Sequence, residues 1–309
     1  MKKQITRKLV ALAAFAILPL GIGCSKEESA PKKPAKSAYK DIEKDFDKTE
    51  PPAAERKPVA GVDMTKLAKP LAVRFESLVD TLPSPCGKAH SLRTSRNTDD
   101  SCKRAPFAVE FVFELLQDGG PNEAIKELYG SRFREQKKVS FKIDTKGPHS
   151  GPTDAAVTIV EFYDYACPHC ARFAPIIEKA LVGLETDVVV YYKQFPLSHN
   201  KDSPGAGQAA VAAYEQGKFK EMHYMLFENP HNHKMSDLKG FAKKIGLDVA
   251  KWESDYKSAK TRVDGDKEEG IEAGLTGTPA IYINGQLYEG VPDAKYLKMY
   301  VKEALSNTI

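Results

Sequence analysis

One short motif in the sequence has residue types and a spacing that can perform redox chemistry, Cys167-Pro168-His169-Cys170. Two cysteines separated by two residues can form and open a disulfide within one turn of chain. The attacking species is a thiolate and not a thiol, so the surroundings of the sulfur decide its reactivity. We expect Cys167 to be the nucleophile and Cys170 to be the shielded resolving thiol.

The same pair could instead be half of a zinc site. Structural zinc takes four ligands, usually two such cysteine pairs or one pair with two histidines. The sequence has no second pair, and His223, His231 and His233 are not spaced like a known ligand set. We therefore expect no metal and interpret these histidines as surface or packing residues.

The residues around the motif predict a strand that leads directly into a helix. Residues 157–163 are rich in β-branched and aromatic types, as in a buried strand. Pro168 suits the first turn of a helix, and apolar residues recur after it at helical spacing. The cysteines then lie at the positive end of a helix dipole, which lowers a thiol pKa. His169 can donate to the Cys167 thiolate or pair with it as a cation, which would make the disulfide a stronger oxidant.

Glu161 lies six residues before Cys167, within the predicted buried strand. Its neighbours Val160 and Phe162 favour burial beneath the turn that holds the cysteines. A buried carboxyl has a raised pKa and can take the proton of Cys170 when that thiol must attack. The alternative is an ordinary strand glutamate in solvent.

Composition limits the class of protein. The chain has 309 residues, of which 41% are hydrophobic and 28% charged, which suits one large or two smaller globular domains. The net charge of +4 comes from four basic residues in the first eight positions, without which basic and acidic residues balance at 42 each. Nothing in this balance favours a nucleic-acid partner.

The amino terminus has the pattern of a targeting segment. Residues 1–23 combine a basic start with an apolar stretch of about fifteen residues, as in a signal peptide. Residues 21–24 resemble a bacterial lipobox, although Leu20 stands one position early. That resemblance implies lipidation of Cys24, and Ser25 after it implies the outer membrane. A soluble secreted protein cut nearby and an uncleaved anchor are the alternatives. Residues 24–60, rich in Lys, Glu, Pro, Ala and Ser, predict a disordered tether.

Residues 61–137 show helical spacing of apolar residues and predict a small helical segment. Its polar loop, residues 83–104, contains Cys86 and Cys102. In an oxidising compartment we expect these two to form a structural disulfide, worth about 3 kcal/mol in the chain-entropy model. The alternative is a second redox pair.

Residues 138–309 predict an α/β domain. Residues 138–144 alternate as a short strand, residues 188–195 form a second buried strand, and residues from about 203 to 274 form a helical insert. Asn284-Gly285 predicts a type I′ hairpin, and a final helix follows. Pro279, at the start of a strand, is a candidate cis proline.

The order strand, cysteine-pair helix, strand, helical insert, Thr278-Pro279, hairpin, helix resembles the thioredoxin fold of the DsbA family of periplasmic thiol:disulfide oxidoreductases. Residues 193–197 (KQFPL) and 276–280 (TGTPA) extend this resemblance. It implies Cys167 as nucleophile, Cys170 as resolving thiol and Glu161 as the buried acid. It also implies that Thr278, before cis-Pro279, pairs with a bound client peptide as an added strand.

We therefore expect an envelope enzyme without a cofactor that introduces disulfides into reduced or unfolded clients. A quinone-linked membrane oxidase is the expected partner for reoxidation. A reductase or isomerase on the same fold is the first alternative, and dimerisation through the helical segment would favour it. A peptide-binding lipoprotein with a purely structural cysteine pair is the second.

Overall fold

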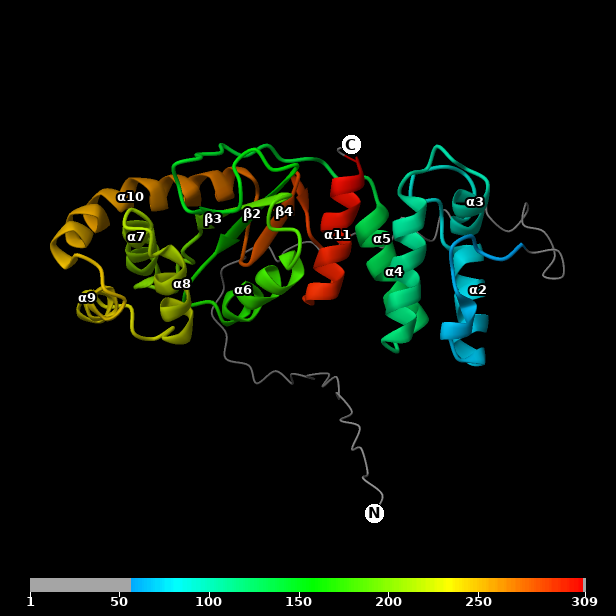
Figure 1. The fold of residues 1–309 in the computed structure, drawn as a ribbon, viewed down its shortest axis with the longest axis horizontal. Helices are drawn as coiled ribbons and strands as arrows, with labels where there is room; N and C mark the ends of the chain where they lie inside the picture. The colour runs from blue at the N-terminus through cyan, green and yellow to red at the C-terminus, as the bar shows by residue number, and fades with distance from the viewer. Residues whose placement is uncertain (1–56, 308–309) are drawn as a thin grey trace, which may run out of the picture. The chain divides into compact units, whose positions relative to one another are not determined.

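The computed structural model describes residues 57–307 (Figure 1). All of them belong to one compact unit. The predicted signal peptide, Cys24 and nearly all of the predicted tether lie outside the described residues. Among residues 57–307, no helix is both long and apolar enough to cross a membrane.

A mixed sheet organises the second half of the chain, and within residues 57–307 it has five strands in the order β1-β3-β2-β4-β5. The strands are β1 (His149–Ser150), β2 (Val157–Tyr163), β3 (Val188–Gln194), β4 (Ala280–Ile283) and β5 (Gln286–Leu287). β2 pairs in parallel with β3 and antiparallel with β4. A parallel pair needs a crossover connection, and α6 (Pro168–Leu181) supplies it between β2 and β3.

Helices flank the sheet and also precede it. Those of the first half are η2 (Met64–Lys66), α2 (Lys69–Thr81), α3 (Leu92–Asn97), α4 (Ala105–Gln117) and α5 (Asn122–Phe133). The predicted insert between β3 and β4 comprises α7 (Ser203–Tyr214), α8 (Phe219–Glu228), α9 (Met235–Lys244) and α10 (Val249–Glu272). The last helix is α11 (Ala294–Asn307), which packs against α6.

The two faces of β2 belong to different cores because side chains alternate along a strand. Ile159 and Tyr163 face the larger core, which includes Cys170 and the apolar side of α6. Val160 and Phe162 face a smaller core on the other side. Glu161 therefore points to the face that α6 covers.

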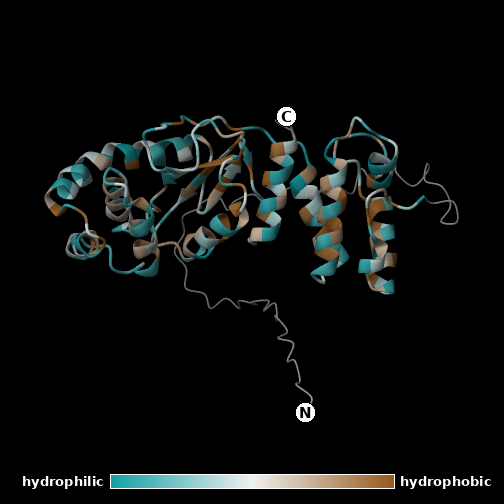
Figure 2. Ribbon diagram, in the orientation of Figure 1, coloured by the Kyte–Doolittle hydropathy of each residue, from teal (hydrophilic) through white to brown (hydrophobic). Residues whose placement is uncertain are grey.

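The helical segment packs on the last helix of the chain. Its core, built around Phe75 and Phe111, includes Tyr296 and Met299 of α11. Figure 2 shows the runs of apolar residues along α2 and α4 that form this core. α11 turns another face, with Leu297, to the core of the sheet. The helical segment and the sheet thus share one helix.

Two sequence predictions for this region need correction. Residues 138–144 do not form a strand in the described structure. The N–H of Val139 donates to the carbonyl of Gly285, but the N–H of Lys142 donates to the Glu269 side chain on α10, so no ladder continues. Residues 83–104 are not wholly loop, because Ser91 caps the short helix α3 through the N–H of Thr94.

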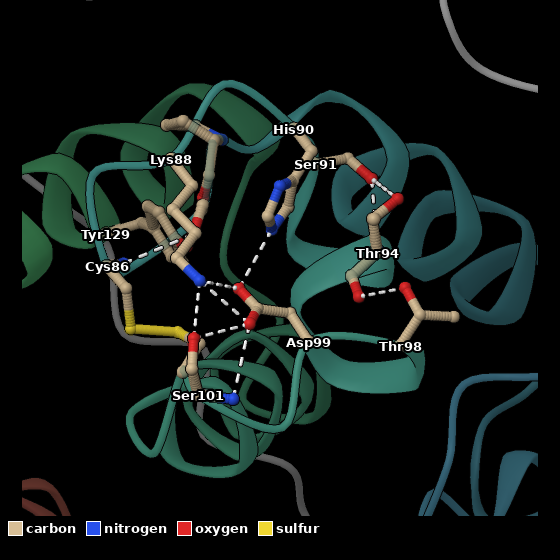
Figure 3. Close-up of polar contacts among 12 residues, drawn as sticks. Cys86, Lys88, His90, Ser91, Thr94, Thr98, Asp99, Ser101 and Tyr129 are labelled. Atoms are coloured by element: carbon tan, nitrogen blue, oxygen red, sulfur yellow. Dashed lines mark hydrogen bonds and ion pairs between the residues drawn. A yellow bond between two sulfur atoms is a disulfide. The ribbon is translucent and has the colours of Figure 1, made fainter.

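Cys86 and Cys102 are joined by a disulfide within this loop (Figure 3). The bridge lies beside a polar cluster centred on Asp99, which accepts from Lys88 Nζ at 2.8 Å and from Ser101 Oγ at 2.6 Å. The expected hairpin is present: Asn284 and Gly285 have positive φ angles of 47° and 80° between β4 and β5.

Candidate functional site

Cys167 is the N-cap residue of α6, and its position follows from the local sequence. β2 ends at Tyr163, Asp164 turns the chain, and Pro168 in the first helical turn has no N–H to leave unsatisfied. Cys167 and Cys170 are both free thiols in the structure. Cys167 is 6% exposed and Cys170 is fully buried. The predicted nucleophile is thus largely covered.

The two thiols have opposite electrostatic surroundings. The pKa of Cys167 is lowered to about 5, chiefly by the Cys170 thiol, with the backbone N–H groups of Cys170 and His169 adding to the effect and burial opposing it. Burial, and then the neighbouring sulfur, raise the pKa of Cys170. At neutral pH one sulfur is charged and the other is protonated.

His169 influences the nucleophile differently from the sequence prediction. Its ring Nδ1 lies 2.7 Å from Arg172 Nη2. A guanidinium can only donate, so Nδ1 accepts in this contact. The residue acts on Cys167 through its backbone N–H. The expected imidazolium–thiolate pair is therefore not present among the contacts of the described residues.

Glu161 is fully buried in the middle of β2, in register with Tyr192 of β3 and Ile281 of β4. Neither carboxyl oxygen has a hydrogen-bond partner within the described part of the chain. Burial raises its pKa to about 8. The carboxyl is therefore largely neutral at pH 7, on the side of the sheet where Cys170 lies.

The loop before β4 lies next to the nucleophile. The Thr278–Pro279 peptide bond is cis, and the carbonyl oxygen of Thr278 is 3.5 Å from Cys167 Sγ. Residues 276–278 form one wall of a cavity of about 360 Å³, residues 197–200 form another, and residues 166–169 complete it. Cys167 lines this groove together with Thr278.

Sequence reasoning missed Asp164 and Tyr165, which build the turn before Cys167. Asp164 is 2% exposed and accepts four hydrogen bonds. The hydroxyl of Tyr165 lies 3.0 Å from Nδ1 of His223, a buried histidine of α8 whose pKa is lowered to about 3 by burial. An aspartate directly after a strand signals an Asx turn, but nothing local indicates its distant partners. Residues 57–307 contain no cluster of three potential metal ligands.

The sheet, the cysteine pair at the start of α6 and the Thr278–Pro279 loop beside it together define a thioredoxin-fold thiol:disulfide oxidoreductase. The family described as Thioredoxin matches residues 144–303, slightly more than half of the chain, and the chain belongs to this family. The predicted thioredoxin-like fold class and family are confirmed. The lipoprotein form stays a prediction.

Known proteins are similar to about half of the chain. Over 166 residues it is 32% identical to the Na(+)/H(+) antiporter NhaA 1 of Mycolicibacterium gilvum, covering 52% of this chain and 27% of that protein. The chain thus spans about a quarter of the length of this relative. The catalytic domain of Proteus mirabilis ScsC (28% identity, 53% and 91% coverage, TM-score 0.47) and BdbD from Bacillus subtilis (25%, 55% and 100%, TM-score 0.47) are similar solved structures. Because both TM-scores are below 0.5, the family assignment depends on the sequence match.

Proposed function

We propose that this protein oxidises cysteine pairs in reduced or unfolded client proteins of the periplasm or cell envelope. The observation that supports this direction is the charged state of Cys167, whose pKa is lowered to about 5. A stabilised thiolate stabilises the reduced pair. The corresponding disulfide is then a stronger oxidant.

The reaction has two exchange steps. A client thiolate attacks the Cys167 sulfur of the Cys167–Cys170 disulfide, forms a mixed disulfide and releases Cys170. The leaving sulfur needs a proton because its pKa is raised, and neutral Glu161, on the face of β2 that packs on the core containing Cys170, is the proposed donor. A second client thiolate then attacks the client sulfur of the mixed disulfide and releases Cys167 as a thiolate. Two electrons pass from the client dithiol to the enzyme pair.

The groove beside Cys167 suits an extended client segment. Thr278 lies at its edge, before the cis proline, and would pair with client backbone as an added strand. A quinone-linked membrane oxidase would then return the enzyme to its disulfide form. No cofactor is required for either exchange step.

The location is part of the proposal. The Cys86–Cys102 disulfide supports an oxidising compartment. The predicted signal peptide and lipidation at Cys24 would anchor the protein at the outer membrane, with residues up to 60 as a tether.

The alternatives share the fold but differ in measurable properties. An isomerase that dimerises through its helical segment would need a free apolar face there. In the structure, Tyr296 and Met299 of α11 pack into the apolar core of the helical segment. A purely structural role for the cysteine pair is not favoured, because Cys167 lines a cavity and the pKa of its thiol is lowered.

The deciding experiment is equilibration of the purified protein with glutathione buffers. A reduction potential near −120 mV, as in DsbA, supports the oxidase, and one near −270 mV, as in thioredoxin, points to a reductase. Cys167→Ala should abolish client oxidation and Cys170→Ala should accumulate mixed disulfides. A Cys86→Ala/Cys102→Ala variant is the matched control and should keep activity. Client oxidation by Cys167→Ala would refute the mechanism.

A further inference from the structure

We propose that Asp164 is a positioning residue that holds the client-facing wall of the groove at a fixed distance from Cys167. This inference rests on the proposed function, because it concerns how a client reaches the same thiol. Asp164 is 2% exposed and lies three residues before Cys167, at the end of β2. It belongs to the turn between β2 and α6 that contains Cys167.

The carboxylate of Asp164 has a donor at each of four acceptor sites. Oδ1 accepts from the N–H of Ala166 at 2.7 Å and from Ser203 Oγ at 2.6 Å. Oδ2 accepts from the N–H of Leu197 at 2.8 Å and from Asn200 Nδ2 at 2.9 Å. Hydrogen bonds to a charged acceptor are roughly twice as strong as neutral ones. One side chain therefore joins the nucleophile's turn, the loop after β3 and the first turn of α7.

The loop held by Oδ2 is a wall of the groove. Residues 197–200, residues 276–278 and Cys167 all line the same cavity. A small thiol reagent needs the sulfur alone, whereas a client peptide also needs both walls in place. Displacing reacting groups by about 1 Å can cost about 100-fold in rate. Asp164 should thus matter for peptides and not for small disulfides.

The groups that set the charge of Cys167 do not include the Asp164 side chain. The sulfur responds to the Cys170 thiol, to backbone N–H groups of α6 and to Thr278. The carbonyl of Asp164 accepts from the N–H of Cys167 at 3.0 Å, and every substitution retains this bond. Loss of the carboxylate should therefore separate client positioning from thiol chemistry.

Asp164→Asn is the informative substitution because it keeps the shape of the side chain. An amide has one oxygen, so whichever way it is turned, two of the four donors lose their acceptor. Asn200 can rotate its own amide and Ser203 can turn its hydroxyl to compensate. The backbone N–H left on the nitrogen side cannot: it belongs to Leu197 in one orientation and to Ala166 in the other. Asp202→Asn is the matched control: it removes a carboxylate that makes no side-chain capping bond to α7 in the described structure. Ser203→Ala, which removes one donor without changing charge, is a second test if Asp164→Asn does not fold.

The assay uses a Cys170→Ser background and measures the rate at which Cys167 attacks either a disulfide-linked peptide or hydroxyethyl disulfide. We expect Asp164→Asn to slow the reaction with the peptide by about 10- to 100-fold and to leave the reaction with hydroxyethyl disulfide and the ultraviolet-detected pKa of Cys167 unchanged. Ser203→Ala should slow the peptide reaction less, and Asp202→Asn should have no effect.

Equal losses with both disulfides, or no loss with either, would overturn the proposal. The rates do not depend on whether the enzyme oxidises or reduces its clients. A potential in the reductase range would therefore refute the proposed function and leave this comparison intact. A background protein that attacks neither disulfide would refute both.

Discussion

Varying the pH should reveal two slopes in the reduction potential of the Cys167–Cys170 pair. Below the Cys167 pKa of about 5, reduction takes up two protons with two electrons, and the potential falls by about 59 mV per pH unit. Above it, Cys167 is released as a thiolate, one proton is taken up, and the slope is about 30 mV per unit. The pKa of Cys170 is raised, so it adds no further break near neutrality.

The size of the effect at pH 7 follows from the same pKa. With a pKa of about 5 instead of the ordinary 9.0, the thiolate outnumbers the thiol by about 100-fold. The reduced form is favoured by the same factor, and two powers of ten correspond to about 59 mV for a two-electron couple. Since water in the groove screens part of the stabilisation, this is an upper limit on the gain in oxidising strength.

The measurement is equilibration with glutathione buffers from about pH 4 to about pH 8, spanning the predicted break, followed by acid quenching and counting of alkylated thiols. Ultraviolet absorbance of the thiolate gives the pKa independently. His169→Ala is the matched control: the backbone N–H remains, so the break should stay near pH 5. A break that moves upward in His169→Ala would restore the imidazolium explanation. A single slope of about 59 mV up to pH 8 would refute the reasoning altogether.

Three further substitutions test other parts of the structure. Burial raises the pKa of Glu161 from 4.5 to about 8. The stability that the protonated carboxyl allows is therefore fully present below pH 4.5 and is lost as the pH rises through 8. Above pH 8, Glu161→Gln should be more stable than the unmodified protein by up to about 5 kcal/mol in urea unfolding. Replacing Cys86 and Cys102 by Ala should lower the unfolding free energy by about 3 kcal/mol and leave client oxidation intact. Glu303→Gln leaves the buried guanidinium of Arg132 without its carboxylate and should cost about 3–5 kcal/mol by thermal unfolding; a change below 1 kcal/mol would show that the pair contributes little.

Sequence patterns predicted correctly those elements that depend on residues close together in the chain. The apolar run of β2, the proline at the start of α6 and the Asn284-Gly285 turn each depend on neighbouring residues, and all three elements are present. The cysteine pair could therefore be assigned to a helix start without knowledge of the fold. The burial of Glu161 also followed from its strand neighbours.

The failures concern side chains whose partners could not be read from residue spacing alone. Asp164 binds residues 33 to 39 positions away, and spacing gives no sign of these partners. His169 was expected to face Cys167, but Arg172 one turn later competes for its ring. The alternation of residues 138–144 predicted a strand, yet the Glu269 side chain of α10 accepts from the N–H of Lys142, which a ladder would need. For Asp164 and for residues 138–144 a tertiary contact replaced the local preference, and for His169 a neighbour on the same helix did so.

The packing of α11 determines how the two halves of the chain depend on each other. Its Glu303 accepts from Arg104 Nε at 2.6 Å and from Arg132 Nη2 at 2.8 Å, both from the helical segment. A buried carboxylate that loses such partners is costly to keep charged. The opposite face of α11 packs against α6, the helix that begins at the active cysteines. The boundary expected at residue 137 thus marks a change in secondary structure. The core packing and the buried ion pairs extend across this boundary to α11, which in turn packs on α6.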